Sequence, residues 1–303
     1  MIGLALSLPP LDLHQLYHGI FAEEAPDLDL RGPHHGTDPA EVEFVFTFRP
    51  PDDGFTGMTN LRAIFSAGAG VDAIMACPSR PAHVPVFRVE DADQALQMAG
   101  YAAFHVHWHH RDMPTYLAQQ PRGEWRRTLT GLSPTHRRVA VLGFGHMGRA
   151  IARGLVALGY PVVGIARRLP DLPEPGVSHI TTAELDAALP QIDILINVLP
   201  LTEDTRGLID RSFLNRLPQG AALIHMGRGG QVVEADLLAA IDAGHISGAS
   251  LDVFETEPLP PDHPLWTHPR ILITPHVASI PERVRLVRSI RDRLRSLPLK
   301  DAS

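Results

Sequence analysis

The sequence predicts an α/β fold made of two doubly wound domains, and three observations lead to this prediction. From about residue 138 onward, short β-branched runs alternate with amphipathic segments of helical spacing. Near-continuous apolar strands that alternate with helices are typical of a parallel sheet covered on both faces. The first hundred residues repeat the alternation more weakly, and 303 residues suffice for two domains at roughly 150 residues each.

The predicted elements follow from apolar runs, turn residues and capping signals. Strands are expected at the N-terminus and at residues 43–48, 61–68, 84–89, 138–145, 161–166, 192–200, 221–227, 249–254 and 270–276. Helices are expected at 147–158, 233–244 and 281–297, where apolar residues recur at helical spacing. The segment 181–189 opens with Thr181 three residues before Glu184, which is the spacing of a capping box.

Composition narrows the class of protein. The formal net charge is −7, which does not favour nucleic acid or an anionic membrane surface as a partner. The single cysteine, Cys77, rules out an intrachain disulfide and a cysteine-based metal site. The apolar N-terminus lacks the basic start and cleavage site of a signal peptide and is shorter than the ~20 residues of a membrane helix. A cytoplasmic protein is therefore expected.

A glycine motif indicates a dinucleotide site. Gly143, Gly145 and Gly148 form GFGHMG, directly after a predicted strand and at the start of a predicted helix. In this context the first glycine permits a tight turn, and the second lets the backbone approach a pyrophosphate. The third allows close packing of helix on strand. The helix N-terminus then directs its N–H groups at the phosphates.

The end of the next strand indicates which nucleotide is bound. An acidic residue that binds the adenosine ribose is usual there, but this chain has Ala166 followed by Arg167 and Arg168. A carboxylate would repel a 2′-phosphate, whereas a guanidinium binds one through charge-assisted hydrogen bonds. Two solvated surface arginines are common, but they would not explain the missing acid. NADP(H) is therefore predicted as the preferred cofactor, with NAD(H) possible.

Three later motifs end predicted strands, where ligands bind in open α/β sheets. They are HMGRGGQVVE with Arg228, LDVFETEPLP with Glu257, and ITPHVAS with His276. With LGFGHMG and LPLTEDTRGLI they occur in the order found in D-isomer-specific 2-hydroxyacid dehydrogenases. The chain resembles this family over nearly its whole length, most closely its glyoxylate/hydroxypyruvate reductase A branch.

The resemblance implies a Rossmann domain over residues 98–276 and a smaller, flavodoxin-like substrate domain over 1–97 plus 277–303, with the active site between them. It also implies a homodimer, with the segment around residues 104–110 in the contact region.

The resemblance also assigns catalytic roles. Arg228 would grip the substrate carboxylate and keto oxygen, to which its planar fork is suited. His276 would protonate the keto oxygen as hydride arrives, since imidazole exchanges a proton near neutral pH. Glu257 would orient His276 and favour its protonated form.

Further binding residues follow from the resemblance. The backbone amides of Ala69 and Gly70 would hold the substrate carboxylate, and Phe48 is either a cap on the substrate or a core aromatic. The remaining predicted cofactor contacts, beyond the glycines and arginines, are His146, Met147, Pro200, Leu201, Thr205, Met226, Gly227 and Asp252.

Some positions depart from the family pattern. His225 and Gly227 replace the more usual Asn and Ala around Arg228, and Gly100 stands where many relatives have Glu. These changes bear on substrate preference more than on reaction class.

A histidine cluster invites a metal hypothesis. In FHVHWHH, residues 104–110, His105 and His109 are four apart and share one helix face; His107 and His110 complete the cluster. No cysteine or carboxylate nearby completes a zinc site. Packing is the preferred interpretation, and no metal is predicted.

The predicted function is NADPH-dependent reduction of small 2-ketoacids, such as glyoxylate and hydroxypyruvate, to D-2-hydroxy acids. Two alternatives remain open: a reductase of bulkier ketoacids such as phenylpyruvate, and a non-catalytic nucleotide sensor on the same scaffold. The sensor is possible because corepressors that resemble this family can retain the same three residues.

Overall fold

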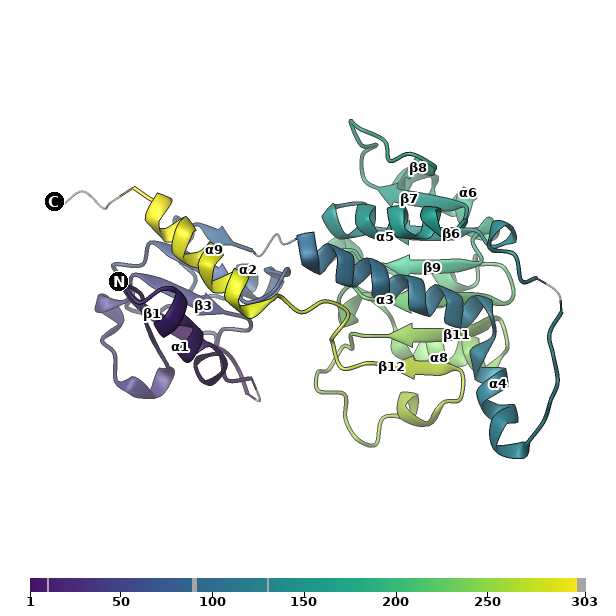
Figure 1. Ribbon diagram of the computed structural model, residues 1–303, viewed down its shortest axis with the longest axis horizontal. Helices are drawn as coiled ribbons and strands as arrows, with labels where there is room; N and C mark the ends of the chain where they lie inside the picture. The colour runs from purple at the N-terminus through teal and green to yellow at the C-terminus, as the bar shows by residue number, and fades with distance from the viewer. Residues whose placement is uncertain (10, 89–91, 130, 299–303) are drawn as a thin grey trace. The chain divides into compact units, whose positions relative to one another are not determined.

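The computed structural model describes residues 1–9, 11–88, 92–129 and 131–298, and it divides into two compact units (Figure 1). The first unit is Met1–Asp93 together with the chain from Ile280 onward, and the second is Gln94–Ser279. Residue 89, at the end of a predicted strand, and residues 299–303, in the predicted first domain, lie outside the described residues.

The second unit is built on one parallel sheet in the order β12-β11-β10-β9-β6-β7-β8. The strands are β6 (Val139–Leu142), β7 (Val162–Ala166), β8 (Val177–Thr181), β9 (Ile194–Asn197), β10 (Ala221–His225), β11 (Ile246–Leu251) and β12 (Ile271–Ile273). The chain runs outward from β6 to one edge and then returns to continue from β9. The carboxyl ends of β6 and β9 therefore meet at a topological switch point, where open α/β sheets bind ligands.

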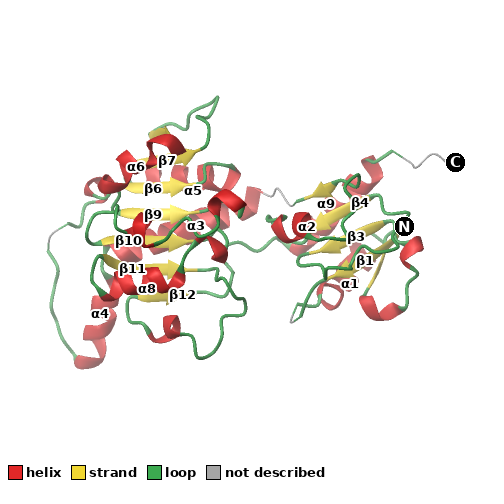
Figure 2. Cartoon of the chain, turned by 180° about the vertical axis from the view of Figure 1, so that it is seen from behind, coloured by secondary structure: helices red, strands yellow, loops and turns green. Residues whose placement is uncertain are grey.

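Helices cover both faces of this sheet. They are α3 (Ala92–His110), α4 (Met113–Gln119), α5 (His146–Ala157), α6 (Leu185–Ala188), α7 (Arg211–Leu214) and α8 (Glu234–Asp242). Along β6, Val139 and Val141 pack with α3 and α5, whereas Ala140 and Leu142 pack with α6, α7 and α8. Figures 1 and 2 view these two faces in turn.

The first unit has a five-stranded parallel sheet in the order β2-β1-β3-β4-β5, which is the flavodoxin-like order. Its strands are β1 (Ile2–Leu6), β2 (Asp29–Arg31), β3 (Phe44–Thr47), β4 (Ala63–Ser66) and β5 (Val86–Phe87), and its helices are α1 (Leu13–Glu24), α2 (Asp72–Ala76) and α9 (Arg283–Ser296). The C-terminal helix α9 packs beside α1 over one sheet face, and Arg288 forms an ion pair with Glu24 at 2.7 Å.

The predicted α/β fold is confirmed, with differences in detail. The strands are shorter than the apolar runs, because several of these runs continue into loops at the carboxyl ends of the strands. β2 and β8 were not predicted, since both are edge strands and neither has a continuous apolar pattern. Thr181 and Glu184 form the predicted capping box, although the helix there is broken into a 3₁₀ turn and α6.

Candidate active site

The predicted cofactor and catalytic residues of the second unit gather along one edge of its sheet. All seven strands are parallel, so their carboxyl ends lie at the same edge. Gly143 follows β6, Arg167 follows β7, Arg228 follows β10, and His276 follows β12. Residues far apart in the sequence therefore meet where parallel sheets bind their ligands.

The glycine loop has the geometry that phosphate binding requires. Gly143 has φ = 105°, and a Cβ there would lie 3.0 Å from the backbone of Val198 and Leu199. A Cβ on Gly148 would lie 2.0 Å from the carbonyl oxygen of Gly143, so only glycine lets α5 pack this close. Apart from the adjacent residues of the chain, no described residue comes within 4 Å of a Cβ built on Gly145, the N-cap of α5. The loop is therefore tight against the protein and open above the helix N-terminus.

His146 and Met147 are the first two residues of α5. The N–H groups of the first turn of a helix have no partner within the helix. This turn can therefore accept an anion, and a dinucleotide pyrophosphate fits the site.

Arg167 and Arg168 lie exposed in the turn after β7. Within the described part of the chain, neither side chain has an ion pair or hydrogen bond. Arg149 and Arg153 on the neighbouring helix α5, in contrast, both form ion pairs with Glu174, at 3.3 and 3.0 Å. The guanidinium groups of Arg167 and Arg168 are thus available to bind a phosphate group, such as the 2′-phosphate of NADP.

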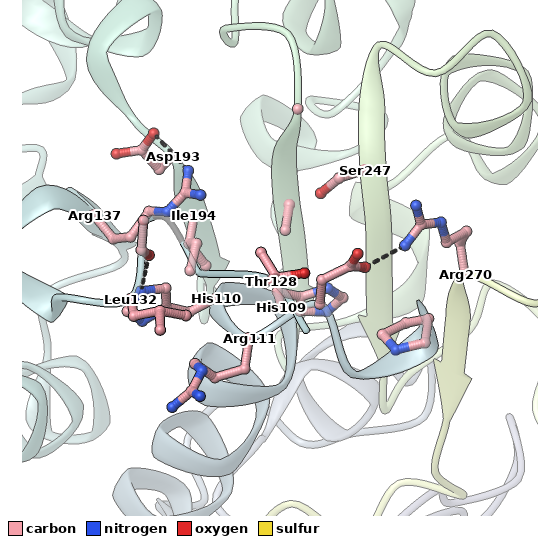
Figure 3. A pocket seen from close by; sticks show the side chains of 15 residues that line it. His109, His110, Arg111, Thr128, Leu132, Arg137, Asp193, Ile194, Ser247 and Arg270 are labelled. Carbon is pink, nitrogen blue, oxygen red and sulfur yellow. Dashed lines mark hydrogen bonds and ion pairs between the residues drawn. The ribbon is translucent and has the colours of Figure 1, made fainter. Parts of the chain in front are cut away.

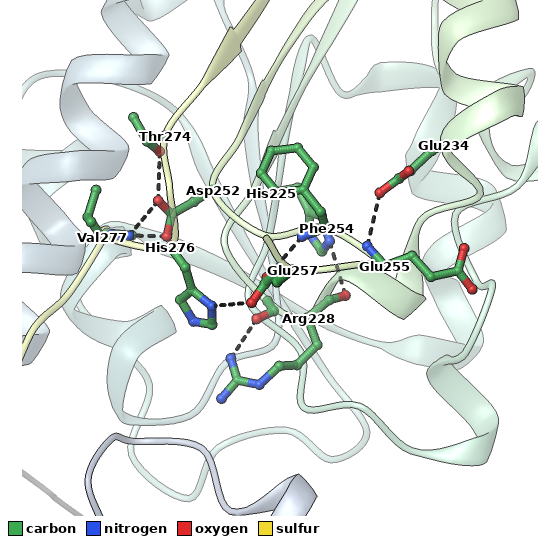
Figure 4. Close-up of polar contacts among 12 residues, drawn as sticks. His225, Arg228, Glu234, Asp252, Phe254, Glu255, Glu257, Thr274, His276 and Val277 are labelled. Carbon is green, nitrogen blue, oxygen red and sulfur yellow. Dashed lines mark hydrogen bonds and ion pairs between the residues drawn. The ribbon is translucent and has the colours of Figure 1, made fainter. Parts of the chain in front are cut away.

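His276 and Glu257 form an ion pair, with 3.0 Å between His276 Nδ1 and Glu257 Oε2 (Figure 4). The other carboxylate oxygen, Oε1, accepts a hydrogen bond from the backbone N–H of Phe254 at 3.0 Å. Because a carboxylate only accepts hydrogen bonds, Nδ1 of His276 carries a proton. A doubly protonated ring then holds its second proton on Nε2.

The backbone at His276 is in the left-handed region, with φ = 55°. Such a conformation is uncommon for residues other than glycine and persists only where the surroundings enforce it. Here the backbone N–H of His276 donates to the carbonyl of Asp252 at 2.8 Å. The Asp252 carboxylate accepts from the next two amides, those of Val277 and Ala278, at 2.8 and 2.9 Å.

Asp252 is 2% exposed and belongs to a buried chain of hydrogen bonds. Its carboxylate accepts from the Thr274 hydroxyl at 2.6 Å, and Tyr101 of α3 lies 2.6 Å from the same hydroxyl oxygen. Since the Thr274 hydroxyl donates its only proton to Asp252, the Tyr101 hydroxyl must be the donor to Thr274. Burial raises the pKa of Tyr101, which keeps it a donor. The loop that carries His276 is thereby held from β11, β12 and α3.

Arg228 follows β10 and caps the 3₁₀ turn Gly229–Gln231. Its guanidinium donates to the carbonyl of Gly227 at 2.6 Å. Gly229 lies directly against the backbone of Phe254: a Cβ at position 229 would be only 1.8 Å from the Phe254 carbonyl carbon. Arg228 and the loop that holds Glu257 therefore lie against each other, as Figure 4 shows.

The other predicted cofactor contacts surround the same edge. Met226 follows β10, is 5% exposed, and donates its N–H to the carbonyl of Asn197 at 3.0 Å. The Pro200 carbonyl accepts from the Thr205 hydroxyl at 2.8 Å, which shapes the turn that includes Leu201.

In the first unit, Phe48 and the loop with Ala69 and Gly70 lie together. The loop is shaped by Ser66, whose hydroxyl donates to the carbonyl of Gly70 at 2.7 Å. A Cβ on Gly68 would lie 3.3 Å from the Phe48 ring. Phe48 also packs, partly buried, against the core of this unit.

The histidines of α3 pack into the second unit. His105 Nδ1 and His109 Nε2 both lie within hydrogen-bond distance of the Ser250 hydroxyl, at 2.8 and 2.9 Å. His110 Nδ1 lies 2.8 Å from the Tyr160 hydroxyl. The structure agrees with the packing interpretation for His105, His109 and His110, whereas His107 is exposed. Within the described ranges, no three His, Cys, Asp or Glu side chains are grouped to hold a metal.

A cavity of about 330 Å³ lies at the opposite edge of the sheet, near the amino ends of β9 and β10 (Figure 3). Its lining includes Arg270, which forms an ion pair with Asp112, and Arg137, which lies 3.6 Å from Asp193. These two guanidinium groups are thus paired with carboxylates, and the cavity lies away from the glycine loop. It is not the candidate active site.

Three buried histidines predict a pH-dependent stability. Burial lowers the pKa of His105 and His225 to about 4 and that of His109 to about 3. Below pH 6.5 these histidines become protonated in the unfolded chain but stay neutral in the folded chain. Stability is therefore full above pH 6.5 and falls towards pH 4, by about 1.4 kcal/mol per pH unit for each such histidine.

Tryptophan fluorescence during urea unfolding measures this dependence, because Trp108, Trp125 and Trp266 all lie in the second unit. His109→Asn should reduce the slope of unfolding free energy against pH. The exposed His107→Asn on the same helix should leave the slope unchanged. Equal slopes for all three proteins would contradict the prediction.

Two residues of the site edge were missed by the sequence analysis. Asn197 and Gln231 are fully buried; Gln231 Oε1 accepts the backbone N–H of Arg228, and the Asn197 amide donates to the same oxygen. A polar residue at the end of the apolar run ILIN was an available signal for Asn197. Nothing in the sequence marked Gln231, because its hydrogen bonds to Leu199 and Pro200 form only once the chain is folded.

No helix in the described ranges combines the length and the apolar character that crossing a membrane demands.

Comparison with known proteins identifies the family. Residues 104–278 match the model of the D-isomer specific 2-hydroxyacid dehydrogenase, NAD binding domain. A glyoxylate/hydroxypyruvate reductase A of Photorhabdus laumondii is 39% identical over 280 residues, which cover 90% of this chain and 87% of that protein. One of Salmonella paratyphi B is 40% identical over 246 residues, covering 79% and 77%.

Solved structures agree with this match. A D-isomer specific 2-hydroxyacid dehydrogenase from Xanthobacter autotrophicus, in complex with NADPH and MES, has a TM-score of 0.87 and 37% identity, covering 97% of this chain and 93% of that one. An NADPH-dependent glyoxylate/hydroxypyruvate reductase from Sinorhizobium meliloti, in complex with NADP and sulfate, has a TM-score of 0.87 and 31% identity, covering 97% and 92%. The chain therefore belongs to the D-isomer specific 2-hydroxyacid dehydrogenase family, and within it is similar to the glyoxylate/hydroxypyruvate reductase A proteins.

Proposed function

We propose that this protein reduces small 2-ketoacids, such as glyoxylate and hydroxypyruvate, to D-2-hydroxy acids with NADPH. The observation that carries the proposal is the Glu257–His276 ion pair next to Arg228, at the same sheet edge as the glycine loop. The names of the similar proteins support the reaction and the substrate class.

In this proposal a bound NADPH supplies the hydride to the keto carbon. The Arg228 guanidinium binds the carboxylate and keto oxygen of the substrate through paired hydrogen bonds, for which its planar donors are suited. His276 delivers the proton on Nε2 to the keto oxygen, while Glu257 holds Nδ1 and fixes the orientation of the ring. The product is a 2-hydroxy acid.

The proposed preference for NADPH rests on the turn after β7. Arg167 and Arg168 supply two cations where the chain lacks the usual acid, and their side chains project from an exposed turn. Two similar structures contain NADPH or NADP, which supports this assignment.

For the first unit, Ala69 and Gly70 remain the proposed donors of backbone N–H groups to the substrate carboxylate. The homodimer stays a prediction. Phe104 on α3, and Trp125 and Leu129 beyond it, are exposed and offer apolar area for such a contact.

The experiment is a measurement of kcat/KM for glyoxylate, hydroxypyruvate and phenylpyruvate, each with NADPH and NADH. The expected result is highest activity with the two small ketoacids and NADPH. A preference for phenylpyruvate would identify a reductase of bulkier ketoacids. Binding of NADPH without turnover of any of the three would identify a nucleotide sensor.

A further inference from the structure

Three fully buried polar side chains lie behind Arg228, and the proposed reaction does not use them directly. They are Asn197 at the end of β9, His225 at the end of β10, and Gln231 in the 3₁₀ turn that Arg228 caps. Each is at most 1% exposed. Buried polar groups are costly unless hydrogen-bonded, so their partners reveal what the cluster holds in place.

The direction of each hydrogen bond follows from the amide of Asn197. Its Nδ2 lies 3.1 Å from His225 Nδ1 and 2.9 Å from Gln231 Oε1. Since an amide nitrogen only donates, His225 Nδ1 is an acceptor and the ring proton is on Nε2. That Nε2–H donates to the backbone carbonyl of Arg228 at 3.1 Å (Figure 4). Burial lowers the pKa of His225 to about 4, which keeps the neutral form.

Gln231 holds the other side of the Arg228 backbone. Its Oε1 accepts the N–H of Arg228 at 2.9 Å, in addition to the amide of Asn197. Its Nε2 donates to the carbonyls of Leu199 and Pro200, at 3.0 and 2.9 Å. One side chain therefore joins the Arg228 backbone to the loop after β9.

Glycine at position 227 fits this arrangement. A Cβ there would lie 2.3 Å from Gln231 Oε1. The departures noted from the sequence, His225 and Gly227, are thus two parts of one cluster. The histidine supplies a donor to the Arg228 carbonyl, and the glycine leaves room for the oxygen that accepts the Arg228 N–H.

We propose that Gln231, with His225 and Asn197, is a positioning residue that fixes the Arg228 backbone, and through it the guanidinium, for binding of the ketoacid. This inference rests on the proposed function of Arg228. With both the N–H and the C=O of Arg228 held, the side chain starts from a fixed peptide plane and needs less ordering when substrate binds.

The test is a double-mutant cycle between Gln231→Met and Arg228→Gln, measured as kcat/KM for hydroxypyruvate at saturating NADPH. Methionine preserves length and removes both hydrogen-bonding functions. If Gln231 acts through Arg228, Gln231→Met should lower kcat/KM by about 10-fold or more in the native background and less than about 2-fold in the Arg228→Gln background. Equal losses in the two backgrounds would overturn the proposal.

His225→Asn provides a second variant should Gln231→Met fold poorly. It should reduce kcat/KM with Arg228 present and have no effect once Arg228 is replaced. Gln119→Met is the matched control, because Gln119 is also buried but belongs to α4; it should leave kcat/KM unchanged.

The single variant Arg228→Gln tests the proposed function separately. If it keeps native ketoacid turnover, the assignment of Arg228 fails, whatever the result for Gln231. If it loses turnover and the cycle shows no coupling, only the positioning role fails.

Discussion

Replacing His276 with asparagine is expected to lower kcat for ketoacid reduction by about 10²- to 10⁴-fold, the usual contribution of a general acid. The substitution removes the proton donor from the Glu257 ion pair. Asparagine is the appropriate replacement because the backbone here has φ = 55°, a region that asparagine tolerates better than alanine. The Asp252 contacts that hold the following amides remain available.

The affinity for NADPH distinguishes loss of the proton donor from disruption of the cofactor-binding site. A fluorescence titration of His276→Asn should give a dissociation constant close to that of the native protein, because the glycine loop is untouched. His268→Asn is a matched control, since His268 also pairs with a carboxylate, that of Asp242, outside the site. Native kcat in His276→Asn would show that another group donates the proton.

Replacing Arg167 and Arg168 together with alanine is expected to raise KM for NADPH by about 10- to 100-fold, as two charge-assisted hydrogen bonds to an exposed phosphate are lost. KM for NADH should change little, because NADH has no 2′-phosphate. The fold should be unaffected, since both side chains are exposed and have no partner among the described residues.

Steady-state kinetics with both cofactors measures the ratio of KM for NADPH to KM for NADH. Arg153→Ala is the control, because Arg153 is an exposed arginine of α5 whose charge is already paired with Glu174. Its ratio of the two KM values should stay native. If the double variant raised both KM values equally, Arg167 and Arg168 would be surface residues with no role in selecting the cofactor.

Most of the fold was predictable from the sequence, because apolar runs indicate buried strands and glycines indicate the turns that follow them. The run before Gly143 is a strand packed on both faces, and each of its residues is buried. β8 was not predictable, since Val177–Thr181 pairs only with β7 and none of its five residues is fully buried. An edge strand of this kind has no continuous apolar pattern.

The candidate site was predictable where a residue type carries its own chemistry, as His276, Glu257 and Arg228 do. The residues that hold them were not. Tyr101 reaches Thr274 from a helix 173 positions away, and Gln231 binds the carbonyls of Leu199 and Pro200 across a loop. Such contacts depend on the packing of strands and helices, which sequence spacing does not specify.

A single-turnover measurement with hydroxypyruvate shows whether this chain transfers hydride from NADPH to a small 2-ketoacid. Native protein in excess over NADPH is mixed with hydroxypyruvate, and cofactor fluorescence and product chirality are recorded. The expected result is complete oxidation of the NADPH and formation of the D-hydroxy acid. NADPH that binds and remains reduced, or formation of the L-isomer, would rule out the proposed reaction.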